Sequence, residues 1–242
     1  MVGVGSQGEE MNDLFQRRVV YTLGLMLALC LVAAPTFAQK RGKEAREASR
    51  RSADAADVFK EIMGAPDRAI PQDLVDKAQA IAVFPGVLKA AFIFGGREGK
   101  GVISRRTGSG WSAPAYFKLA GGSFGAQIGA DKTDYVLLIM NEDGLNKLLS
   151  DKFELGGSVG VAAGPVGREL SAATDAQLTA EILTYSRSKG AFIGASLNGS
   201  TITPDNNLNE AVYGLDARDV LKSGVNSTPY ALLIYPQTLS RY

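Results

Sequence analysis

The sequence predicts an α+β domain built around a glycine-rich, strongly curved antiparallel sheet, either open or barrel-like, with an N-terminal helix and short peripheral helices. Between residues 81 and 202, short apolar runs rich in β-branched and aromatic residues are separated by Gly, Pro or Asp. Such runs are typical of the strands of a meander. Many of the 28 glycines lie inside these runs, as in GGSFGAQIG and GGSVGVAAG. Helical patterns precede the runs and follow them.

The prediction that the sheet is curved rests on the glycines inside its strands. Glycine weakens a strand unless a bulge, a bend or a close backbone approach requires it. The alternative is that the glycines form loose loops. The apolar residues between them favour a tightly curled sheet.

The first residues predict an export signal. Arg17 and Arg18 precede the uncharged run VVYTLGLMLALCLVAA, and the small residues Thr36 and Ala38 follow it. A positive region, an apolar region and a small-residue exit, in that order, are typical of a secretory signal. We expect residues 1–38 to be a signal peptide, with translation starting at Met11. We therefore expect an exported protein, periplasmic or secreted, that is peripheral to a membrane. An uncleaved anchor is the alternative.

Cleavage after residue 38 would set the composition of the mature chain. Cys30 follows Leu29, which is too large for a lipidation site, so we interpret it as an apolar residue of the signal. The mature chain then has no cysteine and forms no disulfide. The signal removes two of the 26 basic and three of the 25 acidic residues, which leaves 24 and 22. This balance does not indicate a nucleic-acid partner.

The sequence contains no histidine, which excludes Ser-His-Asp and Cys-His catalysis and zinc sites built on histidine. The stretch SRSK, from Ser186 to Lys189, matches the S-x-x-K pattern of a serine nucleophile. It lies in a strand-to-turn context without the motifs that accompany it in such enzymes. We therefore predict a protein that is not an enzyme and has no cofactor or metal, with a carboxylate-based hydrolase as the remaining enzymatic alternative.

A basic helical segment is predicted over residues 39–64, in one domain with residues 65–242. The stripe that repeats at steps of three and four consists of Ala45, Ala48, Ser52, Ala55, Phe59 and Ile62. Gly64 and Pro66 end it. Six basic residues stand against Glu44 and Glu47, a local net charge of +4. They are Lys40, Arg41, Lys43, Arg46, Arg50 and Arg51.

Further short helices are expected around the strands. PQDLVDKAQ begins at Pro71, which suits a first helical turn, and EDGLNKLLS makes one or two turns. Lys189 and Gly190 join two strands as a hairpin. DNNLNEAVYG and DARDVLKSG form helices that glycine ends. The last helix starts in STPYALLIYPQTL, and Pro236 leaves its second half open.

The stretch FGGREGKGV resembles a phosphate-binding loop, but the spacing contradicts that function. Gly95, Gly99 and Lys100 lie one residue too close, and Gly101 replaces the metal-binding hydroxyl. A strand pattern follows, where such a loop requires a helix. We predict a hairpin with GREG as its turn and no nucleotide site. Its cations either face an anion or keep a sheet edge soluble. They are Arg97, Lys100, Arg105 and Arg106.

Several motifs resemble the SYLF domain family. AIAVFP, AAFIFGGREGKGV, GWSAPAYFKLAGGSFGAQIG, LLIMN, GVAAGPVGR, YSRSKGAFIGASLNG and NEAVYG occur in the family's order, over about residues 44–225. The family includes a yeast actin-patch protein and plant FYVE proteins. The resemblance implies a lipid-binding module, because eukaryotic members bind phosphoinositide membranes and some bind or bundle actin. Their lipid-binding region combines an N-terminal amphipathic helix with a basic surface, and residues 40–51 occupy a comparable place.

These observations lead to one expected function and two alternatives. We expect a non-catalytic module that binds anionic phospholipid or phosphoinositide-type head groups through the ten basic residues named above. One alternative is an envelope scaffold that binds a protein, which the resemblance to actin-binding members of the family implies. The other is an acyl-chain carrier. We expect neither a nucleotide nor a nucleic acid as a partner.

Overall fold

The computed structural model describes residues 42–65, 69–91, 95–123, 129–150, 152–157, 160–167, 179–188, 191–195, 197, 199–225 and 227–242. The chain forms two compact units, Met1–Glu44 and Ala45–Tyr242. The predicted signal peptide, Cys30, Lys40 and Arg41 lie outside the described residues.

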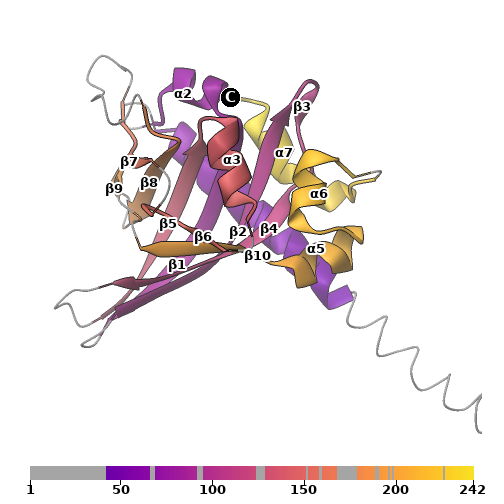
Figure 1. The fold of residues 1–242 in the computed structure, drawn as a ribbon, viewed down its shortest axis with the longest axis horizontal. Helices are drawn as coiled ribbons and strands as arrows, with labels where there is room; N and C mark the ends of the chain where they lie inside the picture. Colours follow the sequence, from indigo (N-terminus) through magenta and orange to yellow (C-terminus); the bar gives the residue numbers. More distant parts are fainter. Residues whose placement is uncertain are drawn as a thin grey trace, which may run out of the picture. The chain divides into compact units, whose positions relative to one another are not determined.

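The described strands of the second unit form a ten-stranded sheet with the order β6-β10-β4-β2-β1-β5-β8-β7, to which β3 adds on β2 and β9 on β8. β6 and β10 cross in front of the long strands β1 and β5, which shows how strongly the sheet curls (Figure 1). The strands are β1 (Ala80–Ala91), β2 (Gly95–Thr107), β3 (Gly110–Trp111), β4 (Ala115–Ser123), β5 (Gly129–Ile139), β6 (Phe153–Glu154), β7 (Val161–Ala163), β8 (Ile182–Ser188), β9 (Ala191–Gly194) and β10 (Ser200–Pro204).

The predicted fold class, α+β with a curved glycine-rich sheet, is confirmed, with one difference in strand direction. The described pairs are antiparallel except β7 with β8, which run parallel. The predicted hairpin between β8 and β9 is confirmed, since Ser188 pairs with Ala191.

The glycines of β2 fit against a bulge in β1. The register of β1 shifts between Phe84 and Val87, where Gly86 has a φ of 55°. A Cβ on Gly99 would lie 2.5 Å from Val87 Cγ2, and a Cβ on Gly101 would lie 2.4 Å from the carbonyl oxygen of Val83. The close approach of β1 therefore requires both glycines.

The hairpin between β1 and β2 exists, but the predicted position of its turn is wrong. Ala91 pairs with Gly95, and Leu88 pairs with Glu98, so the residues of GREG lie within the ladder. The connection falls at residues 92–94, outside the described part of the chain. Gly99, one of the two glycines that suggested a turn, serves the close packing of two strands instead.

Helices cover both faces of the sheet. The N-terminal helix is described over residues 42–63, and from residue 45 on it runs behind the sheet in Figure 1, whereas α3 lies in front. The other helices are α2 (Gln72–Lys77), α3 (Glu142–Leu148), α5 (Asn206–Tyr213), α6 (Ala217–Lys222), the 3-10 turn η2 (Tyr230–Leu232) and α7 (Ile234–Leu239). None of the described helices is long and apolar enough to cross a membrane.

Each face has its own hydrophobic core. One core joins the N-terminal helix, α2 and α7 to the sheet, with Phe59, Val75, Val83 and Tyr235 inside it. The other joins α3 and α6 to the opposite face and contains Phe84, Leu145 and other apolar residues. The predicted stripe of the N-terminal helix is buried from Ala48 to Ile62, and its first residue, Ala45, is exposed.

The helix ends follow local rules. The side chain of Asn141 accepts a hydrogen bond from Gly144 N at the start of α3, and Asp216 caps α6 through Asp219 N. Gly214 ends α5 in the left-handed region, with a φ of 72°. Pro236 lies in the first turn of α7, where its missing N–H has no intrahelical acceptor to lose.

Candidate functional site

The cations predicted on the N-terminal helix and on β2 meet at one carboxylate. Glu47 Oε2 lies 2.9 Å from Arg50 Nη2, and its Oε1 lies 3.0 Å from Arg51 Nε and 3.2 Å from Lys100 Nζ. Burial opposes the shift, but hydrogen bonds from the three cations outweigh it and lower the pKa of Glu47 to about 2. We call this group, together with Lys118 and Asp205, the Glu47 cluster.

Arg51 forms the buried centre of the Glu47 cluster. It is 5% exposed, and its Nη1 lies 2.9 Å from Oδ2 of Asp205, which is also 5% exposed. Nη1 forms no hydrogen bond of acceptable geometry with any acceptor in the described residues, so its contact with Asp205 is an ion pair. Oδ1 of Asp205 lies 2.9 Å from Lys118 Nζ. Arg51 therefore ties the N-terminal helix to the residue before α5, and the expectation that it faces a membrane is wrong.

The other cations of the Glu47 cluster reach solvent. The side chains of Arg50, Lys100 and Lys118 are 64%, 51% and 47% exposed. Arg46 is also exposed, one helical turn before Arg50. The four cations and two carboxylates of the cluster carry a net charge of +2, and its accessible part is basic. Each of the exposed cations can approach an anionic surface without leaving the fold.

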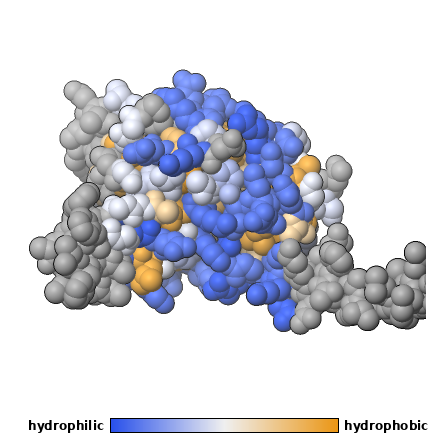
Figure 2. Space-filling view, turned by 60° about the horizontal axis from the view of Figure 1, so that its bottom comes forward, coloured by the Kyte–Doolittle hydropathy of each residue, from blue (hydrophilic) through white to orange (hydrophobic). Residues whose placement is uncertain are grey.

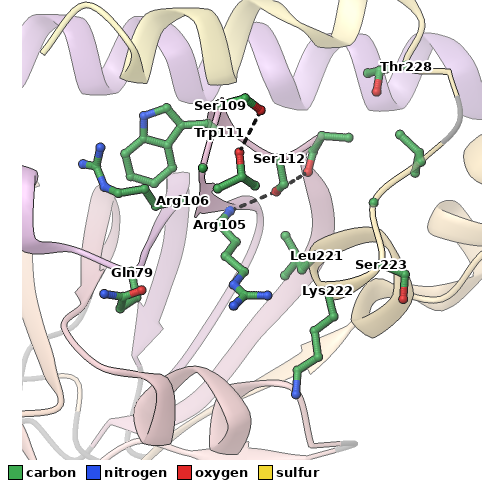
Figure 3. A pocket seen from close by; sticks show the side chains of 15 residues that line it. Gln79, Arg105, Arg106, Ser109, Trp111, Ser112, Leu221, Lys222, Ser223 and Thr228 are labelled. Carbon is green, nitrogen blue, oxygen red and sulfur yellow. Dashed lines mark hydrogen bonds between the residues drawn. The ribbon is translucent and has the colours of Figure 1, made fainter.

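A second basic site lies where β2 and β3 meet the end of α6. It is a cavity of about 650 Å³ that Arg105, Arg106 and Trp111 line from the β2–β3 turn and Lys222 lines from α6 (Figure 3). We call it the Trp111 pocket. Its other polar lining residues are Gln79, Thr107, Ser109, Ser112, Ser223 and Thr228.

Arg106 is held at the Trp111 pocket by neutral acceptors. Its guanidinium carbon lies 4.3 Å from the centre of the Trp111 ring, a cation–π contact. Its Nη2 donates to Val75 O at 2.7 Å and its Nε donates to Ala78 O at 3.1 Å. These carbonyls lie at the C-terminal end of α2, where the helix dipole favours a cation. Because they are neutral, they leave the positive charge of Arg106 uncancelled.

Arg105 and Lys222 extend together toward α3 on the other side of the pocket (Figure 3). Arg105 Nη2 lies 2.6 Å from Glu142 Oε1, and Lys222 Nζ donates to Asn146 Oδ1 at 2.5 Å. Arg105 Nε is buried and has no hydrogen-bond acceptor in the described part of the chain. The three cations of the Trp111 pocket thus face one carboxylate.

The basic hairpin predicted on β2 does not form a single patch, because its cations are spread along the strand, with Lys100 about 17 Å from Arg105. Lys100 joins the Glu47 cluster, Arg105 and Arg106 line the pocket, and Arg97 belongs to neither. Arg97 is half-buried beside Lys89 of β1, and its Nε has no described acceptor. The alternative of a soluble sheet edge is also wrong, since β2 lies between β1 and β4.

The remaining predicted residues lie at the start of the chain. Lys43 is exposed and belongs to the unit Met1–Glu44, and Lys40 and Arg41 lie outside the described residues. Ser186 lies in β8, and Lys189 of the same pattern is not described. Among the described residues, no group of three His, Cys, Asp or Glu side chains could hold a metal.

The sequence analysis did not single out Lys118, Trp111 or Lys222. Lys118 follows an ordinary strand alternation, and Lys222 looks like a cation in the last turn of a helix. The motif GWS, from Gly110 to Ser112, carried a resemblance but no chemical role. Only the meeting of distant segments shows what these side chains share.

Comparison with known proteins shows the family to which this chain is similar. Residues 120–241, half of the chain, match the family model described as Ysc84, Las17-binding protein actin regulator. The LAS seventeen-binding protein 3 of Saccharomyces cerevisiae is 37% identical over 175 residues, which cover 70% of this chain and 38% of that protein. The SH3 domain-containing YSC84-like protein 1 of Xenopus laevis is 35% identical over 172 residues, 68% of this chain and 51% of that protein.

The similarity covers only part of these relatives. For Protein YSC84 of Saccharomyces cerevisiae, 38% identical over 158 residues, the aligned share is 64% of this chain and 33% of the relative. The chain thus spans between a third and about half of the three relatives. The matched residues 120–241 include Asp205 and Lys222, whereas Arg51, Lys100 and Trp111 precede them.

Proposed function

Because the chain belongs to the Ysc84 family, we propose that it is a non-catalytic binding module and that its ligand is the anionic surface of a membrane. The observation that carries this proposal is the exposed basic part of the Glu47 cluster with Arg46 beside it. The N-terminal helix, β2 and β4 all contribute to it. Its cations come from separate segments that the fold holds in place, so the surface is present before any ligand binds.

The charges give a weak and reversible attraction. Each Lys or Arg near an anionic leaflet contributes about 1 kcal/mol. Four exposed cations against the partly exposed Glu47 and against Asp54, whose Oδ2 lies 4.0 Å from Arg50 Nη1, therefore supply roughly 2 kcal/mol. On the face that Figure 2 shows, hydrophilic residues dominate and hydrophobic residues form only separate spots.

The test is sedimentation with vesicles of phosphatidylcholine, alone or mixed with phosphatidylserine, at low and high salt. We expect binding only to the mixed vesicles, and loss at high salt, because exposed charges are screened within about 8 Å at physiological ionic strength. Replacing Arg46, Arg50 and Lys100 together by Gln should weaken this binding.

The matched control removes three exposed charges elsewhere, by replacing Lys77, Lys152 and Arg241 with Gln. It should bind vesicles almost as wild type does. If the two triple variants bind equally, net charge alone acts, and the Glu47 cluster is not the membrane site.

A protein ligand is the second candidate, because two relatives are named as binding proteins or as SH3 domain-containing proteins. Binding to a protein that resists high salt and survives in the Arg46, Arg50 and Lys100 variant would favour it. The third expected function, carriage of an acyl chain, predicts that lipid co-purifies with the protein, which native mass spectrometry detects.

We also propose that the protein is exported and begins at Gln39, on the order of Arg17, Arg18, the apolar run and Ala38. Sequencing the N-terminus of the protein from its native host tests this. A chain that starts at Cys30 with added acyl mass would show a lipidated anchor instead.

A further inference from the structure

We infer that the Trp111 pocket binds a hydroxyl-bearing phosphate ester. This inference does not rest on the membrane proposal, because the pocket shares no residue with the Glu47 cluster. Lys100 and Arg105 are five residues apart on β2, about 17 Å at the rise of an extended strand. The two basic surfaces can therefore act separately.

The charges of the Trp111 pocket select an anion with more than one charged oxygen. Arg105, Arg106 and Lys222 face only one carboxylate, that of Glu142. Guanidinium groups present paired donors that match the oxygens of a phosphate, and a charged acceptor makes such hydrogen bonds stronger. The buried Nε of Arg105 is a donor that still lacks an acceptor among the described residues.

The rest of the lining selects hydroxyl groups on the same ligand. Five hydroxyl side chains and the amide of Gln79 line the cavity. Ser112 already donates to Ala113 O and accepts from Arg105 N, so the other four hydroxyls and the amide are the groups that can bind a ligand. The volume of about 650 Å³ is within the usual range for a small-molecule site. An acyl chain does not suit this lining, because it would bury these polar groups without partners.

Trp111 makes the inference directly measurable, since it is the chain's one tryptophan. Selective excitation of tryptophan in the full chain reports only on this pocket. We expect glucose 6-phosphate to change the Trp111 emission in a saturable manner, and calorimetry to give the same affinity. Inorganic phosphate should bind more weakly because it lacks the hydroxyl-bearing part, and glucose should not bind because it lacks the charge. Equal binding of glucose and glucose 6-phosphate, or binding of neither, would overturn the inference.

Three substitutions test the side chains. Arg105→Gln and Lys222→Gln should each weaken glucose 6-phosphate binding about tenfold or more, the loss of one hydrogen bond to a charged group. Glu142→Gln should strengthen it, because it frees Arg105 from its carboxylate. Lys222 is exposed, so its variant keeps the fold even if the Arg105 variant does not.

The matched control is Lys152→Gln, which removes an exposed charge that is not part of the pocket lining and should leave binding unchanged. If Lys222→Gln binds glucose 6-phosphate as wild type does while Lys152→Gln weakens binding, the pocket is not the site. A head group and a free ester share this chemistry. Competition by short-chain phosphatidylglycerol identifies a lipid as the source, and its failure to compete identifies a free ester, with the pocket occupied in both cases.

Discussion

Arg51 shows how one side chain can look like a surface cation and act as a structural one. Its neighbours in sequence are basic and its helical position borders the buried stripe, so local pattern cannot separate the two roles. The structure places it 2.9 Å from the buried Asp205. Removing one partner of a buried pair leaves an uncompensated charge.

We therefore predict that Arg51→Gln lowers the free energy of unfolding by about 3 kcal/mol, near the lower end of the range for buried pairs because Lys118 still faces Asp205. Urea denaturation measures this. Arg50→Gln is the control and should change the free energy by less than about 1 kcal/mol, as for exposed ion pairs. Equal effects of the two variants would contradict the buried pair.

The acidity of Glu47 gives a second prediction for a single residue. Its pKa falls from 4.5 to about 2 on folding, so the unfolded chain binds this proton more readily. The stabilisation is complete above pH 4.5 and is lost as the pH falls toward about 2. The melting temperature of wild type should exceed that of Glu47→Gln at neutral pH, and the difference should shrink through this interval. A difference that does not change with pH would show that Glu47 is not titrating there.

At the scale of elements, alanine substitutions in β2 test whether the close packing of β1 requires the glycines of β2. A Cβ on Gly101 would lie 2.4 Å from Val83 O and 2.5 Å from Phe84 Cδ1, so β1 must move to admit it. We predict that Gly101→Ala lowers the free energy of unfolding by about 2 kcal/mol, as overpacking does. Gly96→Ala is the matched control, since the nearest atom to its Cβ would be Gly121 O at 4.0 Å. Similar denaturation midpoints for both variants would show that β1 moves at little cost in free energy.

Most elements could be predicted because their signals are local. Asn and Asp caps mark α3 and α6, a terminal glycine marks α5, and short apolar runs broken by Gly, Pro or Asp mark the strands. The turn of the first hairpin could not be predicted, because the sequence pattern of a glycine inside a strand is the same as that of a glycine in a turn until the partner strand is known. The parallel pair of β7 with β8 has no local signal either.

At the scale of the molecule, the candidate sites depend on contacts between distant segments. Arg51 and Asp205 are 154 residues apart, and Arg105 and Lys222 are 117 apart. The sequence analysis grouped basic residues by neighbourhood along the chain, whereas the fold groups them by contacts between distant segments. The fold divides one predicted basic stretch of β2 between two surfaces, because Lys100 lies about 17 Å along the strand from Arg105.

This division predicts that the two surfaces bind independently. Sites more than about 10 Å apart that share no partner have additive effects. Saturating glucose 6-phosphate should therefore leave the protein bound to mixed phosphatidylcholine–phosphatidylserine vesicles. The combined Lys100→Gln and Lys222→Gln variant should show in each assay only the loss that its own single variant shows. Release of wild type from vesicles by glucose 6-phosphate, but not by glucose, would mean that the Trp111 pocket faces the membrane and that the Glu47 cluster only holds the N-terminal helix in place.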